Sequence, residues 1–261
     1  MTYFGVLLSS MGVPLLALAS ISALDLRRCQ ALRPPFRSWS PWLALLGLVL
    51  LALVYTTPWD NYLVANRIWW YAPDRVTGVT LGWVPIEEYT FFVVQTLVVG
   101  LWLLLWMRRM PVPAVLSPLW KSVRWVSAVV GSLLWGTWLA VLLSRWPRGL
   151  YMALILVWAL PPIVAQLAFG ADILWRYRRL VLVGLLPAFL YLCLVDAVAI
   201  GSSVWTINPN NVLGVYLGGV LPLEEAVFFL VTSMLVVSGM VLVLAQESHV
   251  RAGLSPKAEA T

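Results

Sequence analysis

Charged residues are scarce in this sequence. They make up 11% of its 261 residues, whereas 62% are hydrophobic and the mean hydropathy is +0.90. Soluble domains are about 45–50% apolar and about 25% charged. The shortage of charge therefore excludes an ordinary water-soluble domain and a disordered chain, and it predicts a protein with several membrane-spanning segments.

Histidine, cysteine and lysine are also rare. A single histidine, His249, excludes a histidine-based metal site, and Cys29 and Cys193 cannot build a disulfide framework. The two lysines, Lys121 and Lys257, lie outside the last apolar segment. A pigment that holds retinal through a lysine Schiff base is therefore excluded.

Motifs for common cofactors are missing. The sequence has no GxGxxG, P-loop or GxSxG motif and no DDxxD-type acidic cluster. We therefore expect no cofactor, no metal and no magnesium-dependent diphosphate chemistry. The net charge of +6 comes from short basic clusters between apolar stretches, so it does not predict binding to nucleic acid.

Seven apolar segments have about the length that crosses a bilayer, for which a helix needs about 20 residues. They cover residues 3–24, 40–56, 85–107, 123–144, 150–170, 180–200 and 222–245. The connections at 57–84 and 201–221 are rich in Gly, Pro, Asn and Trp, and we expect short re-entrant or interfacial pieces there. The predicted fold class is an all-α polytopic membrane protein with seven transmembrane helices.

The basic residues predict the orientation in the membrane. Of the 17 Lys and Arg residues, 13 follow the first, third, fifth and seventh segments. Cytoplasmic loops are enriched in Lys and Arg. We therefore predict a multi-pass protein of the cell membrane with its N-terminus outside and its C-terminus in the cytoplasm.

The sequence contains an internal repeat. PIEEYTFF at residues 85–92 recurs as PLEEAVFF at residues 222–229. Because the copies are four helices apart, the repeats are parallel and related by an axis along the membrane normal. The predicted parts are a first repeat (1–110), a linking helix region (111–147), a second repeat (148–247) and a disordered cytoplasmic tail (248–261).

The paired glutamates of the two motifs, Glu87–Glu88 and Glu224–Glu225, are the main candidates for chemistry. A Glu near the third helical position can cap its own helix. A second acid beside it is costly near hydrocarbon, and the pair occurs in both repeats, so capping alone does not account for it. A carboxyl group in an apolar site can stay neutral and act as a general acid.

Other polar and aromatic residues accompany the glutamates. Asp60 and Asp196 precede the two motifs at similar distances and are candidates for orienting the glutamates, with interfacial turns as the alternative. Aromatic rings can stabilise a carbocation, although packing is the alternative for each ring. The candidates for lining the substrate or stabilising a cation are Phe91, Phe92, Phe228, Phe229 and Trp83. Asp172 and Arg176 are expected to form a solvated pair at a helix end.

The two PxEE motifs and the stretch TPWDNYLVANRIWWY (57–71) resemble the small integral-membrane lycopene cyclases, over roughly residues 3–245. In that family two homologous short polypeptides form a heterodimer or are fused in one chain, and this chain resembles the fused form. The same cyclase domain stands at the N-terminus of fungal bifunctional cyclase–phytoene synthases. The second repeat departs from the pattern, since Trp83 has no Trp counterpart and Asp60-Asn61 becomes Asp196-Ala197.

The resemblance implies a cofactor-independent, redox-neutral cyclisation of lycopene to β-carotene by way of γ-carotene. In that reaction a carboxyl group protonates the terminal double bond, the carbocation closes the ring, and loss of a proton gives a β-ionone ring. Glu87 and Glu224 are the first candidates for acid and base, followed by Glu88 and Glu225. The implied partners are lycopene and lipid, and a homo-oligomer or contacts with other carotenoid-pathway enzymes are the protein partners to consider.

Two alternatives remain open from sequence. A proton-coupled transporter could have the same 3+1+3 plan of parallel repeats. However, the third segment has only Gln95 and Thr96 as polar breaks between Phe91 and Trp106, which favours an apolar substrate. The other alternative is a cyclase of longer carotenoids or a hydratase that quenches the same cation with water.

Overall fold

The computed structural model describes residues 1–112 and 118–254 of the chain. Within these residues, seven helical segments are long and apolar enough to cross a membrane, which confirms the predicted fold class. The first segment joins α1 (Tyr3–Val6), a π-helical stretch (Leu7–Gly12) and α2 (Val13–Arg27). The others are α3 (Pro41–Ala65), α4 (Ile86–Arg109), α5 (Lys121–Leu143), α6 (Leu150–Arg176, after a 3-10 turn at Pro147–Gly149), α7 (Arg178–Gly201) and α8 (Leu223–Leu244).

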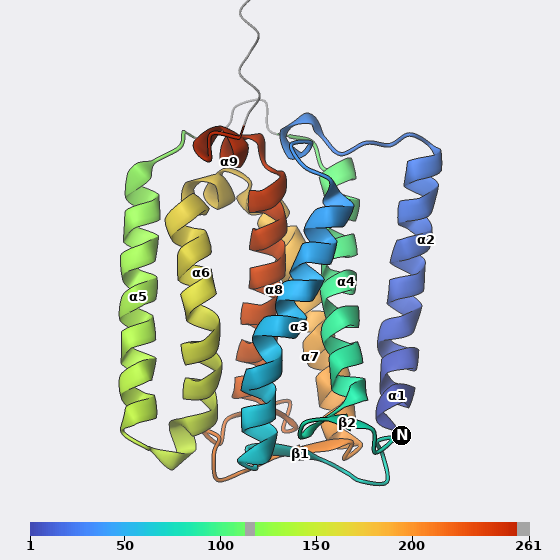
Figure 1. Ribbon diagram of the computed structural model, residues 1–261, viewed down its shortest axis with the longest axis vertical. Coiled ribbons are helices and arrows are strands. Elements are labelled where there is room, and N and C mark those ends of the chain that lie inside the picture. Colours follow the sequence, from blue (N-terminus) through green and yellow to red (C-terminus); the bar gives the residue numbers. More distant parts are fainter. Residues whose placement is uncertain (113–117, 255–261) are drawn as a thin grey trace, which may run out of the picture.

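The helices pack around α4 and α8, which are the most buried of the seven. These two helices contact each other, and α4 also contacts α2, α3 and α7, while α8 contacts α3, α6 and α7. Figure 1 shows α5 at one edge of the bundle beside α6, and α2 at the opposite edge. No residue of α5 is buried, because this helix packs against α6 on one side only.

The helix α3 continues to Ala65, well beyond the predicted end at residue 56. Thr57, Pro58 and Asp60 suggested a connection after the apolar segment, but all three lie within the helix. Asp60 is fully buried, so its polarity marks a position facing the protein interior and not the end of a membrane span.

Four helical prolines are places where neighbouring helices are joined. Pro14, Pro161, Pro162 and Pro187 have no N–H, so the carbonyl four residues earlier loses its helical donor. In each case an aromatic side chain of another helix donates to that carbonyl, as the absence of water from a bilayer requires. The pairs are Tyr191 Oη with Ser10 O, Trp135 Nε1 with Val157 O (3.1 Å), Tyr55 Oη with Trp158 O (2.9 Å) and Trp102 Nε1 with Val183 O (2.9 Å).

Short β-strands lie at the end of the bundle that carries the N-terminus (Figure 1). β1 (Trp69–Tyr71) pairs antiparallel with β4 (Trp205–Ile207) and so joins the two long connections. β2 (Thr80–Leu81) pairs with β3 (Val84–Pro85), and β5 (Tyr216–Leu217) pairs with β6 (Leu221–Pro222). The two hairpins lead directly into α4 and α8, so each PxEE motif begins its helix at this same end.

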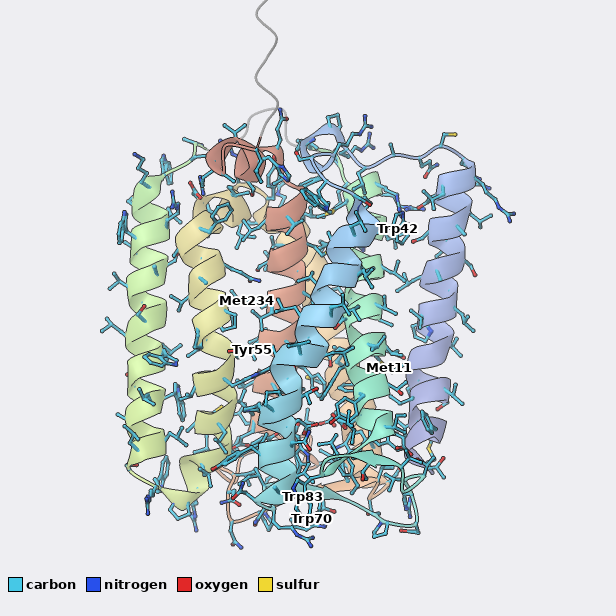
Figure 2. All side chains as sticks on the ribbon, viewed as in Figure 1. Met11, Trp42, Tyr55, Trp70, Trp83 and Met234 are labelled. Carbon is cyan, nitrogen blue, oxygen red and sulfur yellow. The ribbon has the colours of Figure 1, made fainter. Side chains whose placement is uncertain are left out.

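Tryptophans lie near both ends of the bundle. Figure 2 shows Trp70 and Trp83 at the end with the strands and Trp42 toward the opposite end. Trp83 and Trp42 are exposed on the surface of the bundle. This distribution is typical of membrane proteins, in which tryptophan is enriched at the two interfaces.

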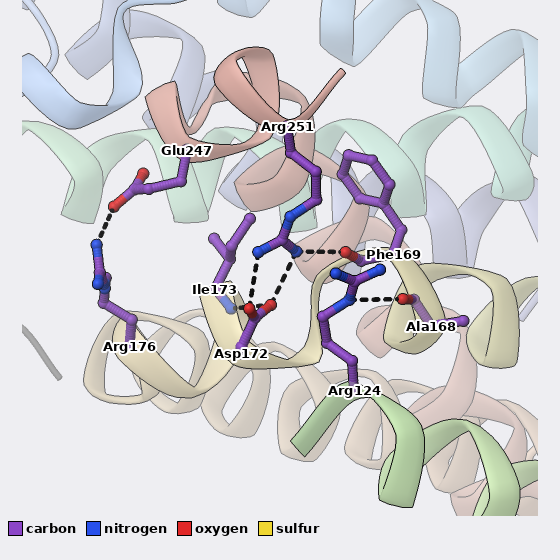
Figure 3. A network of polar contacts seen from close by, with 8 residues as sticks. All are labelled: Arg124, Ala168, Phe169, Asp172, Ile173, Arg176, Glu247 and Arg251. Atoms are coloured by element: carbon purple, nitrogen blue, oxygen red, sulfur yellow. Dashed lines mark hydrogen bonds and ion pairs between the residues drawn. The ribbon is translucent and has the colours of Figure 1, made fainter. Parts of the chain in front are cut away.

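At the opposite end, α6 is kinked at Gly170, where φ is −151°. Two arginines bind backbone carbonyls beside the kink (Figure 3): Arg124 Nε donates to Ala168 O at 2.9 Å, and Arg251 donates to Phe169 O. Arg251 belongs to α9 (Gln246–Arg251) and also binds the Asp172 carboxylate at 2.7 Å. The short C-terminal helix therefore holds the kinked end of α6.

Two expectations about this end need correction. Asp172 is buried against Arg251, and Arg176 binds Glu247 at 2.9 Å, so Asp172 does not form a solvated pair at a helix end. The predicted disordered tail begins too early, because α9 extends to Arg251 and is held by this ion pair. The last part of the predicted tail, residues 255–261, lies outside the described residues.

Candidate active site

A small cavity of about 40 Å³ lies inside the bundle near the end with the strands. Both repeats contribute to its wall, which combines two glutamates, one aspartate and many aromatic rings. The lining residues are Tyr3, Trp59, Trp69, Tyr71, Glu88, Phe91, Phe92, Asp196, Trp205, Ile207, Glu225, Phe228 and Phe229. The cavity thus brings an acid from each PxEE motif into one apolar chamber.

Glu88 lies in the first turn of α4 and is held by two tyrosines. Tyr3 Oη donates to Glu88 Oε2 at 2.5 Å, and Tyr71 Oη donates to the same oxygen at 3.1 Å. Tyr3 is the first residue of α1, and Tyr71 is the last residue of β1. The glutamate is therefore oriented by the N-terminus of the chain and by the strand pair between the repeats.

Glu225 occupies the equivalent position in α8 and is held by one tyrosine. Tyr151 Oη donates to Glu225 Oε1 at 2.5 Å. Tyr151 stands in the first turn of α6, as Tyr3 does in α1. Each glutamate therefore receives a phenol from the first helix of its own repeat, but only Glu88 receives a second one among the described residues.

The strand pair places each of these tyrosines against the other repeat. The ring centroids of Tyr3 and Trp205 are 4.8 Å apart, and those of Tyr151 and Trp69 are 5.5 Å apart. Trp69 and Trp205 lie at the start of β1 and β4. Each tyrosine of one repeat therefore packs against a tryptophan of the other repeat. These contacts fix both tyrosines in the cavity wall, because neither ring can move without displacing that tryptophan.

Tyr71 lies outside the membrane-spanning helices, in β1. Burial raises the pKa of Tyr71 well above its ordinary value, and the nearby carboxyl groups of Asp60 and Glu88 raise it further. The phenol therefore stays neutral over the physiological range of pH and keeps its proton available for the hydrogen bond to Glu88.

Glu87 and Glu224 are buried but do not line this cavity. Glu87 Oε1 accepts a hydrogen bond from the backbone N–H of Thr77 at 2.6 Å, and Glu224 Oε1 accepts one from Leu213 N–H at 2.7 Å. Successive residues of a helix point about 100° apart, so the two adjacent glutamates of each motif point in different directions. The first glutamate of each pair, Glu87 or Glu224, therefore binds the backbone of a loop, and the second, Glu88 or Glu225, lines the cavity.

The two aspartates differ in their surroundings. Asp196 lines the cavity, and its Oδ1 accepts a hydrogen bond from Trp205 Nε1 at 3.1 Å. Asp60 is fully buried in α3, and neither of its carboxyl oxygens has a hydrogen-bond partner within the described part of the chain. Both lie inside the protein, which does not fit the alternative of exposed interfacial turns.

The structure places four of the five predicted aromatic residues in the cavity wall, namely Phe91, Phe92, Phe228 and Phe229. Phe91 and Phe229 meet edge to face with ring centroids 6.1 Å apart. Trp83 is the exception, because it is 67% exposed. It belongs to the turn between β2 and β3, where its N–H binds Asn61 Oδ1 at 2.7 Å while its ring points away from the bundle (Figure 2).

Tyr3 and Tyr151 are not among the candidates from sequence. For Trp69, Tyr71 and Trp205, the sequence favoured anchoring at the membrane interface over lining a pocket. The repeat itself contained a signal for the two tyrosines, since each stands at the start of the first helix of its repeat. The tryptophans carried no such signal, because tryptophan is common at membrane interfaces for other reasons. Within the described residues, no three His, Cys, Asp or Glu side chains form a group that could hold a metal ion.

Known proteins are similar to this chain over most of its length. The sequence model of the family described as lycopene cyclase matches residues 2–109 and 148–243, which leaves out α5. A lycopene beta-cyclase of Halobacterium salinarum is 40% identical over 200 residues, which are 75% of this chain and 79% of the relative. No solved structure matches the chain.

Longer fungal proteins also match most of the chain. The bifunctional lycopene cyclase/phytoene synthase of Aspergillus oryzae is 33% identical over 210 residues, 80% of this chain and 36% of the relative. The protein of the same name from Colletotrichum graminicola is 39% identical over 208 residues, 75% of this chain and 34% of the relative. Only about a third of each fungal protein corresponds to this chain.

Proposed function

This chain belongs to the lycopene cyclase family, and we propose that it converts lycopene to β-carotene by way of γ-carotene. The observation that carries the proposal is the cavity in which Glu88 and Glu225 face aromatic rings from both repeats. A carotene is an apolar molecule that dissolves in the bilayer, and the bundle surrounding this cavity is built from membrane-spanning helices.

The chemistry consists of one proton added and one proton lost. A carboxylic acid in the cavity protonates the terminal double bond of lycopene, and the positive charge forms on the carbon chain. The inner double bond attacks that carbon, closes the six-membered ring and moves the positive charge onto a ring carbon. A carboxylate then removes a neighbouring ring proton, so the product has the same formula as the substrate and no redox partner is needed.

The hydrogen bonds suggest which glutamate performs each step. Glu88 accepts two phenol hydrogen bonds on one oxygen, which stabilises its carboxylate form. Glu225 accepts one. We therefore assign Glu88 as the base and Glu225 as the acid. Each turnover moves one proton from Glu225 to Glu88, and Asp196, which lines the same cavity, is placed to return it.

The aromatic rings of the cavity wall stabilise the carbocation intermediate. The faces of aromatic rings attract a cation, and the effect is larger where water is excluded. Trp59 lies parallel to Phe228 with ring centroids 5.8 Å apart, and Phe91 and Phe229 close another side of the cavity. Excluding water also favours loss of a proton over capture of the cation by water, which separates a cyclase from a hydratase.

The site also supports the predicted organisation of the chain. Because Glu88 and Glu225 come from different repeats, one chamber needs both halves and the fused chain supplies them together. We retain the predicted repeats at 1–110 and 148–247, with 111–147 as the linking region. We also retain the orientation with the N-terminus outside and the C-terminus cytoplasmic, which places the cavity near the outer side of the membrane.

The test is expression in cells that accumulate lycopene, grown in normal and in heavy water, followed by pigment chromatography and mass spectrometry. We expect cyclic product that carries solvent deuterium. Glu225→Gln should leave lycopene unreacted because no cation forms. Glu88→Gln should allow the cation to form and should yield alcohols or rings with a shifted double bond.

Glu87→Gln and Glu224→Gln are the matched controls. A glutamine oxygen can still accept the loop N–H, so both variants should keep activity if these residues only hold the loops. Loss of activity in these two variants, with Glu88→Gln and Glu225→Gln active, would refute the assignment. Unchanged lycopene with well-inserted wild-type protein would overturn the proposed function altogether.

A further inference from the structure

A second and larger pocket, of about 220 Å³, lies beside the cavity. Its walls are one face of α3, at Leu48, Leu51, Ala52, Tyr55 and Thr56, and parts of α4, α6 and α8. These α3 positions follow the spacing of three and four residues that lies on one side of a helix. Leu48 and Thr56 are eight positions apart, which corresponds to about 12 Å of helix, so the pocket is a groove along the bundle axis.

The groove adjoins the candidate active site. Phe92 and Phe228 line both the groove and the cavity that contains the two glutamates. The other lining residues are mostly apolar, and the amide nitrogens of the two lining glutamines have hydrogen-bond partners. Gln95 Nε2 binds Thr232 Oγ1 at 2.9 Å, and Gln166 Nε2 binds the carbonyl of Leu235 at 3.1 Å. The groove therefore offers a long apolar surface that ends at the acids.

Tyr55 and Trp158 close the groove on the side between α3 and α6. Their rings stack with centroids 5.7 Å apart. Tyr55 Oη donates to the carbonyl of Trp158 at 2.9 Å, which is free because Pro162 has no N–H. Figure 2 shows Tyr55 between the two helices, and its side chain is partly exposed at the surface of the bundle.

We propose that this groove binds the linear polyene chain of the substrate, which enters from the bilayer between α3 and α6. The inference rests on the proposed function, because it takes the ligand to be a long acyclic polyene whose end reaches Glu88 and Glu225. Phe92 and Phe228 then mark the point where the reacting end passes from the groove into the cavity. The part of the polyene beyond Leu48 extends past the groove into lipid.

The shape of the groove favours this ligand over others. A rigid, unbranched chain can fill a groove along a bundle, and an apolar chain suits walls whose Gln95 and Gln166 amide nitrogens are already hydrogen-bonded, although Gln166 Oε1 has no partner among the described residues. Entry from the side avoids the polar ends of the helices, which an apolar molecule cannot cross cheaply. The tyrosine–tryptophan pair needs to break only its stacking and a few hydrogen bonds to let a chain pass, because no covalent or ionic link joins α3 and α6 there.

Filling the groove at Ala52 tests the proposal. Purified protein in lipid nanodiscs is given lycopene or a shorter acyclic polyene that carries the same end group. In Ala52→Trp we expect kcat/KM for lycopene to fall by about tenfold or more, equivalent to about 1.4 kcal/mol, and kcat/KM for the short polyene to change by less than about twofold. Val54→Trp is the matched control, because Val54 lies on the same helix, is 75% exposed and does not line the groove.

A binding measurement gives a second readout. Lycopene is achiral, so a circular dichroism signal in its visible band reports that it lies in a chiral site. We expect this signal with the Glu225→Gln variant, which binds without turnover, and its loss in the double variant with Ala52→Trp. If Ala52→Trp does not fold, the smaller substitution Ala52→Leu replaces it. We then expect a smaller decrease in kcat/KM that is still confined to lycopene.

The outcomes separate the two proposals. If the wild type cyclises neither polyene, the proposed function fails. If it cyclises both and Ala52→Trp lowers both equally or neither, the groove does not hold the polyene chain and the inference is overturned. A loss confined to the long substrate, with Val54→Trp unchanged, supports the groove as the polyene site.

Discussion

The tyrosine that holds Glu225 provides the sharpest test of the site. Tyr151→Phe removes one oxygen and keeps the ring that packs on Trp69. The change removes the 2.5 Å hydrogen bond to Glu225 Oε1, which accepts no other hydrogen bond within the described residues. When Glu225 gives its proton to the substrate it becomes a carboxylate, so the lost phenol would have stabilised the charge that forms in this step.

The size of the effect follows from that hydrogen bond. A hydrogen bond to a charged group contributes about 1.5–3 kcal/mol. Each 1.36 kcal/mol changes a rate tenfold, so cyclisation should slow by roughly 10- to 150-fold. Tyr3→Phe should slow it by less, about threefold to tenfold, because Tyr71 still donates to Glu88 at 3.1 Å and only the weaker range of about 0.5–1.5 kcal/mol is lost. The double change at Tyr3 and Tyr71 should approach the effect of Tyr151→Phe.

The assay is the initial rate of cyclic product in nanodiscs at saturating lycopene, with thermal unfolding measured for each variant. Tyr177→Phe is the matched control, because Tyr177 Oη also donates to a glutamate, Glu247 at 2.7 Å, but at the opposite end of the bundle. Its rate should equal that of the wild type. A wild-type rate for Tyr151→Phe, or an equal loss for Tyr177→Phe, would refute the reasoning.

Three further predictions concern stability and use thermal unfolding in detergent as the measurement. Glu87→Ala should lower the free energy of unfolding by about 0.5–1.5 kcal/mol, because the partly buried hydrogen bond from Thr77 N–H to Glu87 Oε1 is lost, and Glu87→Gln should restore most of it. Gly82→Ala should cost about 1–2 kcal/mol, because φ is +71° and a Cβ would stand 2.2 Å from Asn61 Oδ1; a stability equal to wild type would contradict this. Arg251→Met should cost about 3–5 kcal/mol by leaving the buried Asp172 carboxylate unpaired, and Arg251→Lys should cost less; equal losses for both would argue against the ion pair.

The candidate site shows what sequence patterns could identify. The duplicated PxEE motifs directed attention to the two helix ends that meet at the cavity, and the phenylalanines that follow them line it. The sequence-based prediction put Glu87 and Glu224 first, whereas the residues that line the cavity are Glu88 and Glu225. The direction of the Glu88 side chain depends on the residue at which β3 ends and α4 begins. A shift of one residue in the start of α4 would rotate its side chains and turn Glu87 toward the cavity in place of Glu88.

The C-terminal end of α3 shows what hydropathy alone cannot predict. Asp60 and Asn61 are polar, so the apolar segment was predicted to end before them. In the structure Asn61 Oδ1 accepts a hydrogen bond from the backbone N–H of Trp83, and Asp60 is buried. Both polar side chains are therefore accommodated by contacts within the protein. A polar residue in a membrane helix has the same hydropathy whether it faces the protein or lies in water, and only its neighbours distinguish the two.

The sequence by itself determined the seven helices, the duplication and the class of residues at the site, because each of these depends on local composition and spacing. Only the tertiary structure decided that Tyr3 and Tyr151 bind Glu88 and Glu225, that β1 pairs with β4, and that a groove between α3 and α6 meets the cavity. These contacts join residues that are far apart in the chain. Their partners are selected by how whole helices pack, and that selection is a property of three-dimensional complementarity which no single stretch of sequence contains.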